Sequence, residues 1–186
     1  MCGRFFYNEV INTEKIRKII ESKYEQQILQ LWKKDDIYPG DVSLTCTQQD
    51  YQLMKWQYDL FGRKMINTRI ESAEKDFYKN SFENNRCVIL ASGFYEWDQD
   101  KVKYYLHTGE QPIYLAGIYQ ENEVLNGYSI ITTEASTSRS IHPRIPIVLN
   151  QQQAREYLKG EIQPDVLKDI KPDFTIENKF ENLSLF

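Results

Sequence analysis

The sequence is poor in the residues that build metal sites and disulfides. Among 186 residues there are 2 histidines and 3 cysteines, and the cysteines lie far apart in the chain. Three cysteines cannot all pair, and neither paired cysteines nor clustered histidines supply a zinc signature. We therefore expect no disulfide framework, no metal site and no cofactor. Cys46 and Cys87 fall in β-like runs, where a cysteine is usually a small buried apolar residue.

Long apolar runs are also missing. No stretch approaches the roughly 20 residues of a membrane-spanning helix, and the amino end lacks a basic region followed by an apolar segment. These absences predict a cytoplasmic protein that makes no membrane contact. The length of 186 residues and the hydrophobic content of 41% predict a single domain, residues 1–186, and nothing in the sequence demands more than a monomer.

The chain has no excess of basic residues. Its 23 lysines and arginines against 27 aspartates and glutamates leave a net charge of −4. This balance argues against a protein that coats duplex nucleic acid through a broad basic field. It still allows a few arginines to grip individual phosphates.

What is present is a series of short strands with helices gathered at the two ends. Asn12 or Thr13 is expected to cap a helix that runs to about Lys33. Further expected elements are a turn at 38–41, helices at 72–82, 150–159 and 163–170, and strands at 42–46, 51–58, 86–91, 94–98, 102–107, 112–119, 127–132, 146–149 and 173–177. No βαβ order occurs. The prediction is an α+β fold with a mostly antiparallel, barrel-like sheet and flanking helices.

The cysteine in second place is the most informative residue. Removal of Met1, which is usual before a small side chain, makes Cys2 the first residue. A terminal cysteine carries an α-amine and a thiol on adjacent carbons, with ordinary pKa values near 8 and 8.5. Such a pair can attack an ester or amide, or condense with an aldehyde to an imine and then to a five-membered thiazolidine.

Four further islands carry residues capable of chemistry. They are Asn67-Thr68-Arg69-Ile70-Glu71, Gly93-Phe94-Tyr95-Glu96-Trp97, Thr132-Thr133-Glu134-Ala135 and Ile141-His142-Pro143-Arg144-Ile145-Pro146. Aromatic neighbours are expected to raise the pKa of the Glu96 carboxyl. Each island also has a structural interpretation, with the glutamate on a solvent-facing strand, the histidine in a loop hydrogen bond and the tryptophans in the core. With Cys2 they supply a nucleophile, a carboxylate, an imidazole, an amide and several arginines.

In combination and order, these motifs resemble the SRAP family, the SOS-response-associated peptidases. The matching pieces run from Met1-Cys2-Gly3-Arg4-Phe5 through Pro39, Trp56 and the four islands to about residue 149. The resemblance implies a protein that crosslinks covalently to abasic sites in single-stranded DNA and shields them in the DNA damage response. Cys2 would form a Schiff base with the ring-opened sugar and then a thiazolidine. Weak lyase activity and peptidase activity at its own amino end are also implied.

The resemblance carries further roles over by position. Asn67 would hold the terminal amine, Glu96 would be the general acid and base, and His142 would lie beside the sugar oxygens. The implied DNA-binding residues are Arg4, Pro39, Trp56, Arg69, Trp97, Thr132 and Arg144.

Three features depart from the family pattern. Gln57-Tyr58-Asp59-Leu60 follows Trp56 where the family has Gly-Leu-Ile-Pro and a second tryptophan, which puts in doubt a wedge that separates duplex DNA. Thr68 replaces an alanine, and Ile145 replaces a methionine.

Two other functions stay open from the residues alone. An amidohydrolase with an N-terminal nucleophile would use the Cys2 thiol on an amide, but the chain is short for that fold and Tyr128 follows Asn126-Gly127 where an aspartate is expected. A non-catalytic module for single-stranded DNA would bind reversibly and would not need Cys2.

Overall fold

A computed structural model describes residues 2–8, 13–109, 112–135 and 141–178. Five strands form a closed ring at its centre: β3 (Val42–Cys46), β4 (Tyr51–Lys55), β8 (Arg86–Ala91), β11 (Ile113–Gln120) and β12 (Gly127–Glu134). The ring closes because β12 pairs both with β11 and, through one parallel bridge, with β4. The other pairings around the ring are antiparallel. The expected α+β fold with a barrel-like, mostly antiparallel sheet is confirmed.

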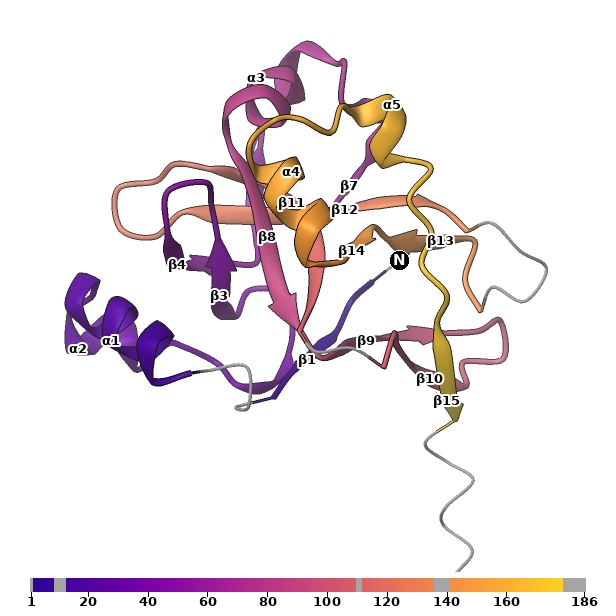
Figure 1. Ribbon diagram of the computed structural model, residues 1–186, viewed down its shortest axis with the longest axis horizontal. Coiled ribbons are helices and arrows are strands. Elements are labelled where there is room, and N and C mark those ends of the chain that lie inside the picture. The colour runs from indigo at the N-terminus through magenta and orange to yellow at the C-terminus, as the bar shows by residue number, and fades with distance from the viewer. Residues whose placement is uncertain (1, 9–12, 110–111, 136–140, 179–186) are drawn as a thin grey trace, which may run out of the picture.

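A second sheet lies beside the ring and contains the amino end (Figure 1). Its order is β15 (Thr175–Asn178), β10 (Lys103–His107), β9 (Gly93–Trp97), β1 (Phe5–Tyr7) and β2 (Asp35–Ile37). The three-residue strands β1 and β2 were not expected, because segments this short contain no periodic pattern. Their pairing places the start of the chain against β9.

Three short strands extend the ring near the amino end. They are β7 (Asn67–Arg69), which pairs in parallel with β12, β13 (Arg144–Pro146), which pairs with β12, and β14 (Val148–Leu149), which pairs with β11. The single strand expected at 146–149 is thus split at Ile147, whose N–H donates to the carbonyl of Ile131. Asn67 and Arg144 are therefore attached to the same strand, β12.

The strand expected at 51–58 ends early. The chain turns after β4, where the Gln57 N–H donates to the Lys55 carbonyl at 2.7 Å. It then forms a hairpin of β5 (Tyr58–Leu60) and β6 (Arg63–Met65), whose tip residues Phe61 and Gly62 have φ of 53° and 77°.

The first helix is shorter than expected. Helix α1 (Glu14–Lys23) begins after Thr13, whose hydroxyl accepts from the Ile16 N–H, and Asn12 lies outside the described residues. It ends because Tyr24 adopts an extended backbone and its hydroxyl accepts from the Leu53 N–H at 3.1 Å. A separate turn of helix, α2 (Gln26–Leu29), follows.

Helices α3 (Asp76–Asn84), α4 (Gln151–Leu158) and α5 (Pro164–Leu167) lie in the regions where helices were expected. The 3₁₀ helix η2 (Ile70–Ser72) ends where the expected helix at 72–82 begins. Asn150 and Gln153 form a capping box at the start of α4, in which each side chain binds the other residue's backbone N–H. Within the described residues, no helix is long and apolar enough to span a membrane.

Candidate active site

Cys2 lies against β9 because β1 continues the antiparallel register. Phe5 pairs with Phe94, and the Tyr95 N–H donates to the Arg4 carbonyl at 2.9 Å. Continued by two residues beyond the Phe5–Phe94 pair, this register would set Gly3 opposite Glu96. Cys2 has no exposed surface and belongs to the core. Pairing of two strands therefore brings residue 2 beside a carboxylate that follows it by 94 residues.

Asn67 anchors Cys2 from the opposite side. Its Nδ2 donates to the Cys2 carbonyl oxygen at 2.8 Å, and β7 is held by its parallel pairing with β12. The structure thus gives a bond to the carbonyl of Cys2, whereas the expectation concerned its amine. The Asn67 Oδ1 is buried and has no hydrogen-bond partner. A buried acceptor of this kind requires an explanation, because leaving it unpaired costs about 1–3 kcal/mol.

Glu96 is the buried carboxyl of the site. It is 1% exposed, in β9 between Tyr95 and Trp97. Burial raises its pKa from 4.5 to about 7, against the opposing effect of the Trp97 backbone N–H. The raised pKa expected from the sequence is found. A group with this pKa exists in both protonation states near neutral pH, as a general acid or base requires.

The Cys2 thiol is held in its protonated form. Burial raises the pKa of this thiol well above its ordinary value, and the negative charge of Glu96 raises it further. Neutral thiols are poor nucleophiles, since the thiolate is the reactive form. Attack by sulfur as the first step is therefore disfavoured, chiefly because the thiol is buried.

His142 precedes β13 and is partly exposed. The Arg144 N–H donates to its Nδ1 at 3.0 Å, and the Arg144 carbonyl oxygen lies 2.9 Å from the same nitrogen. Burial lowers the pKa of His142 below 6.5, although the Arg144 backbone opposes this shift. The ring is therefore largely neutral at pH 7.

The Arg144 guanidinium is occupied by protein groups. It donates to both oxygens of Glu71, at 3.3 and 2.8 Å, and to the Thr132 carbonyl at 2.7 Å and hydroxyl at 3.3 Å. Although burial opposes it, the bond from Arg144 lowers the pKa of Glu71. Arg144 thus joins β13, β12 and η2, and a phosphate would have to displace Glu71 to reach it.

Arg4 is occupied in a similar way. It forms an ion pair with Asp36, and its guanidinium lies over the rings of Tyr38 and Tyr95 at 4.9 and 4.8 Å. Asp36 comes from β2, the strand that pairs with the other edge of β1. Arg4 therefore contributes to the shape of the wall beside Cys2 and has little unpaired charge to offer DNA.

Two of the expected DNA contacts are core residues. Trp56 has no exposed surface, donates from Nε1 to the Ile66 carbonyl at 2.8 Å and packs between Phe5 and Tyr128. Thr132 is also fully buried. Both side chains are engaged by groups within the protein, and their contact with DNA stays a prediction.

The other expected contacts do reach the surface. Pro39 and Arg69 are exposed, and Trp97 is partly exposed at the end of β9. Arg69 and Asn67 stand at opposite ends of β7, one exposed and one facing Cys2. A three-residue strand therefore links the buried centre to the surface.

Sequence reasoning did not identify the groups that hold the arginines. Asp36 lies 32 residues from Arg4, and Glu71 lies 73 residues from Arg144. Glu71 could have been suspected because it ends the motif Asn67-Thr68-Arg69-Ile70-Glu71. Asp36 belongs to none of the motifs. Such pairs depend on which strands meet in the fold.

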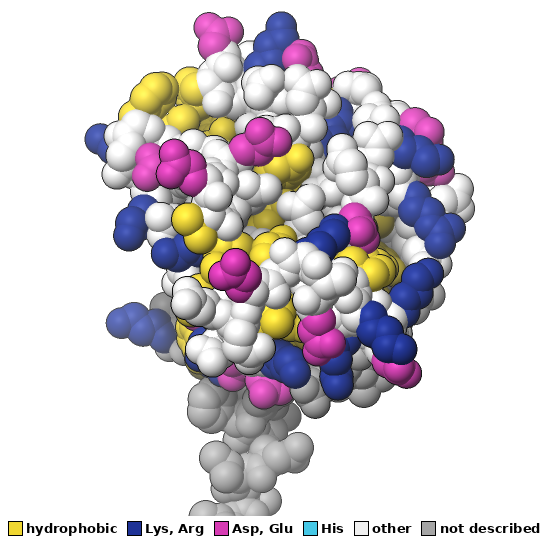
Figure 2. All heavy atoms as spheres, turned by 90° about the vertical axis from the view of Figure 1, so that its left-hand side faces the viewer, with side chains coloured by type: hydrophobic (Ala, Val, Ile, Leu, Met, Phe, Trp, Pro, Cys, Tyr) yellow, Lys and Arg dark blue, Asp and Glu magenta, His cyan; other side chains and the backbone are white. Residues whose placement is uncertain are grey.

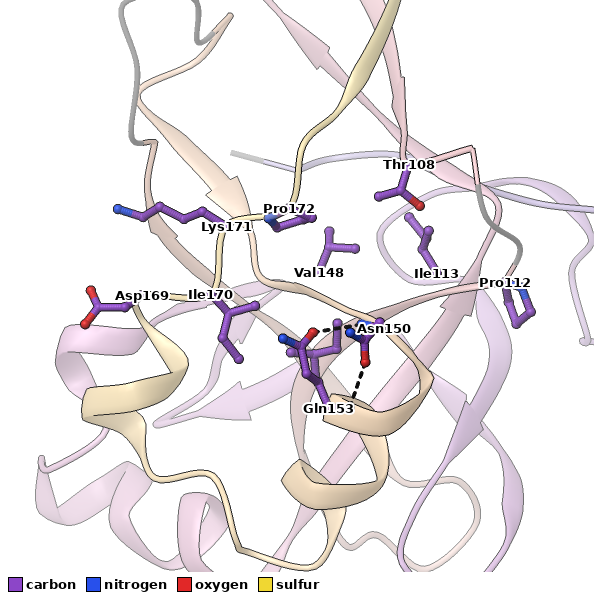
Figure 3. A pocket seen from close by; sticks show the side chains of 11 residues that line it. Thr108, Pro112, Ile113, Val148, Asn150, Gln153, Asp169, Ile170, Lys171 and Pro172 are labelled. Carbon is purple, nitrogen blue, oxygen red and sulfur yellow. Dashed lines mark hydrogen bonds between the residues drawn. The ribbon is translucent and has the colours of Figure 1, made fainter.

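A separate pocket, shown in Figure 3, lies between the start of α4, β14 and residues 169–172. Asn150 and Gln153, two of its lining residues, are engaged in their capping box. Asp169 and Lys171 point away from its centre (Figure 3). None of the predicted site residues lines it.

The surface carries charges of both signs. Figure 2 shows lysines and arginines interspersed with aspartates and glutamates on one face, without a continuous field of either sign. This mixture agrees with the net charge of −4. Attraction of a polyanion therefore has to come from local groups of cations.

The chain is similar to proteins of one family. The family model described as SOS response associated peptidase (SRAP) matches residues 1–181. Abasic site processing protein YedK of Escherichia coli (strain K12) is 26% identical over 182 residues, which cover 87% of this chain and 81% of that protein. Abasic site processing protein YoqW of Bacillus subtilis (strain 168) is 30% identical over 199 residues, covering 91% of this chain and 86% of that protein.

A solved structure supports the same architecture. The crystal structure of a protein from Bacteroides thetaiotaomicron superposes with a TM-score of 0.72 at 18% identity, covering 94% of this chain and 90% of that one. At this identity the likeness concerns the fold alone.

Proposed function

Because the chain belongs to the SOS response associated peptidase (SRAP) family, we propose that it processes abasic sites in DNA by bonding covalently to them through Cys2. Abasic site processing is the activity named for its relatives in Escherichia coli and Bacillus subtilis. The observation that carries the covalent mechanism is a buried Cys2 held by Asn67 beside a carboxyl whose pKa is about 7.

The amine of Cys2 becomes available when Met1 is removed, either by a methionine aminopeptidase or by the protein itself. The unpaired Asn67 Oδ1 is suited to accept a hydrogen bond from that amine, while Nδ2 keeps its bond to the Cys2 carbonyl. One amide would then hold residue 2 at two points. This would orient the nitrogen lone pair toward a bound aldehyde.

The reaction begins at the aldehyde of the ring-opened deoxyribose. The neutral amine adds to the carbonyl carbon to give a carbinolamine, and loss of water gives an imine. Glu96 donates the proton that lets water leave and accepts the proton released by nitrogen. His142, neutral at pH 7, acts as a hydrogen-bond donor to the sugar oxygens.

The sulfur completes the linkage. Addition of the thiol S–H across the C=N bond forms a C–S bond and returns a secondary amine, which closes the five-membered thiazolidine. Because the thiol is protonated in the site, it adds after the imine is formed rather than before it. The same imine would acidify the neighbouring C–H bond, so weak β-elimination with strand cleavage is a further part of the proposal.

The partner in this function is single-stranded DNA, where the sugar is accessible without unpairing. Arg69, Pro39 and Trp97 are the exposed residues suited to contact the strand near the lesion. Arg4 and Arg144 hold the walls of the site. The bound protein shields the lesion from other reactions, and it acts as a monomer.

The decisive test mixes the processed protein with an oligonucleotide that contains one abasic site. A heat-stable adduct with the mass of protein plus DNA is expected on a denaturing gel and by intact mass spectrometry. Cys2→Ala should form none, whereas Cys46→Ala, which removes a partly exposed thiol outside the site, should react normally. An adduct with Cys2→Ala, or none from wild type with a free amine, would refute the proposal.

A further inference from the structure

A second cavity borders the reactive centre. It has a volume of about 400 Å³ and lies between β6, β7 and the start of α3. Asn67, the residue that binds the Cys2 carbonyl, is one of its lining residues. A ligand in this pocket would therefore lie next to the reactive centre, within the size range of small-ligand sites.

The pocket combines an apolar interior with a cationic rim. Met65, Ile66 and the rings of Phe77 and Tyr78 contribute the apolar surface. The charged residues that line it are Lys64, Arg69 and Lys75, all exposed and all basic. No acidic side chain is among its lining residues, although the chain as a whole has an acidic excess.

Two other cavities in the described part of the chain differ in this respect. The pocket between α3 and α5 is lined by Glu74, Glu83 and Asp165 as well as by basic residues. The pocket in Figure 3 has one residue of each sign, Asp169 and Lys171. The cavity beside Asn67 thus selects for a ligand that has a flat apolar part and negative charges at its edge.

An aromatic side chain is held at the rim by a strained turn. Phe61 is 83% exposed and has φ of 53°, a left-handed conformation that is unusual for a bulky residue. Its ring packs edge-on against Phe77 at 6.0 Å, and the neighbouring Gly62 N–H donates to Asp59 Oδ1 at 2.9 Å. A two-residue hairpin turn requires positive φ at both central residues, so the turn between β5 and β6 fixes this exposed ring beside the pocket.

We propose that this pocket takes up one nucleobase next to the abasic site, with its flanking phosphates on Lys64, Arg69 and Lys75. The inference rests on the proposed function and adds a subsite to it. The base stacks on Phe77, where Lys75 Nζ lies 5.9 Å from the ring centroid, and Phe61 borders that ring edge-on. Stacking tolerates any base because each has a π-face. Removal of the lesion's own base also leaves its neighbour without one stacking partner, which lowers the cost of swinging that neighbour into the pocket.

The test uses a tetrahydrofuran analogue of the abasic site, which binds but cannot crosslink. Fluorescence anisotropy would compare strands with a normal base on each side against strands in which one neighbour is also replaced by the analogue. Wild type should bind the base-containing strand roughly tenfold or more tightly, on one side of the lesion only. Equal affinity for all strands would overturn the proposal. A free deoxynucleoside monophosphate should compete weakly, and tight competition would indicate a site for nucleotides rather than DNA.

Two variants connect the effect to the pocket. Phe77→Ala should abolish the preference for a neighbouring base, and Phe77→Tyr should retain it. Phe61→Asn should weaken binding while it raises the melting temperature, because asparagine tolerates positive φ and a folding defect would have the opposite sign. Val166→Ala, an exposed apolar residue on α5, is the matched control. Unchanged binding by both Phe61→Asn and Phe77→Ala would refute the subsite.

The two proposals fail in different ways. If wild type forms no adduct with a true abasic site yet keeps the preference for a neighbouring base, the covalent function is wrong and the pocket stands. If the adduct forms but no base preference exists, the pocket is wrong and the covalent function stands.

Discussion

The two ends of β7 differ in how far their surroundings are exposed to solvent, and this changes the behaviour of the charged groups there. At one end Asn67 binds Cys2, which lies near Glu96. Cys2 and Glu96 are buried, and desolvation raises the pKa values of the thiol and the carboxyl. At the other end Arg69 is exposed and lines a pocket with Lys64 and Lys75. Burial prepares groups for proton transfer by making charge unfavourable, whereas exposure keeps the cations available for phosphates. One short strand therefore separates the chemical centre from the proposed binding surface.

The largest expected effect is on the chemistry of residue 2. Cys2→Ser keeps the amine but replaces sulfur with a poorer nucleophile, so it should form an imine that borohydride traps and almost no heat-stable adduct. Denaturing gels with and without borohydride measure this difference. A heat-stable Cys2→Ser adduct without borohydride would show that the thiol is not needed and would end the thiazolidine proposal.

Glu96→Gln should come next. Removal of the acid and base should slow crosslinking by roughly 10²- to 10⁴-fold, with little change in the affinity for tetrahydrofuran-containing DNA. Single-turnover rates between pH 5.5 and 8.5 check this, since the wild-type rate should change near pH 7 and the variant should lose that change. Glu123→Gln, an exposed residue between β11 and β12, is the control. A variant as fast as wild type would exclude Glu96 from proton transfer.

The same substitution should raise stability at high pH. The folded state holds the Glu96 proton up to about pH 7, while the unfolded chain releases it near the ordinary value of 4.5. Between these values the folded state binds more protons, so the contribution of Glu96 to stability falls as the pH rises. Above pH 7 the buried charge costs about 3 kcal/mol, and Glu96→Gln should recover most of it.

Urea unfolding of wild type and Glu96→Gln at pH 5 and pH 8 would measure that gain. The variant should be more stable than wild type at pH 8, and the advantage should largely vanish at pH 5. An equal difference at both pH values would contradict a carboxyl that titrates near 7. If Glu96→Gln slows crosslinking but stabilises the fold at pH 8, then the buried carboxyl is kept for function at a cost in stability.

The smallest expected effects distinguish Arg69, which we expect to contact a phosphate, from Arg144, which is paired with Glu71. Arg69→Ala should weaken binding to abasic-analogue DNA and lower the slope of log affinity against log salt by about 0.7, the value for one phosphate contact on a single strand. Arg144→Met should leave the slope unchanged and destabilise the fold by about 2 kcal/mol, because it leaves Glu71 and Thr132 without their donor. Salt titrations and urea unfolding of both variants measure the contrast. A reduced slope for Arg144→Met would show that this arginine does reach DNA.

Local pattern was sufficient for most elements of the fold. The strand at 42–46 and the strand at 86–91 match their expected bounds, and Thr13 caps the first helix. The turn at 38–41 forms where expected, with Gly40 at φ of 95°. Expectations failed where tertiary contacts override local preference, as at Tyr24, whose bond to Leu53 ends the helix early.

The type of a residue indicated what interactions its side chain can make, but not whether the side chain is buried or which residue it contacts. Tryptophan suits both base stacking and a core, and only the packing of Trp56 between Phe5 and Tyr128 decides for the core. The charge of an arginine likewise leaves its partner open, and Arg144 found Glu71 because β13 and η2 both lie against β12.

The sequence by itself pointed to the nucleophile that we propose, because a cysteine in second place has a thiol and, once Met1 is removed, a free amine, whatever the fold. It also determined the family and the run of short strands, since motifs and alternation are local properties of the chain. Only the tertiary structure decided which charges are free, which aromatic rings are exposed and what pKa Glu96 has. The physical reason is that desolvation and ion pairing depend on neighbours from other strands, and pairing of β1 with β9 and of β7 with β12 brings those neighbours to Cys2.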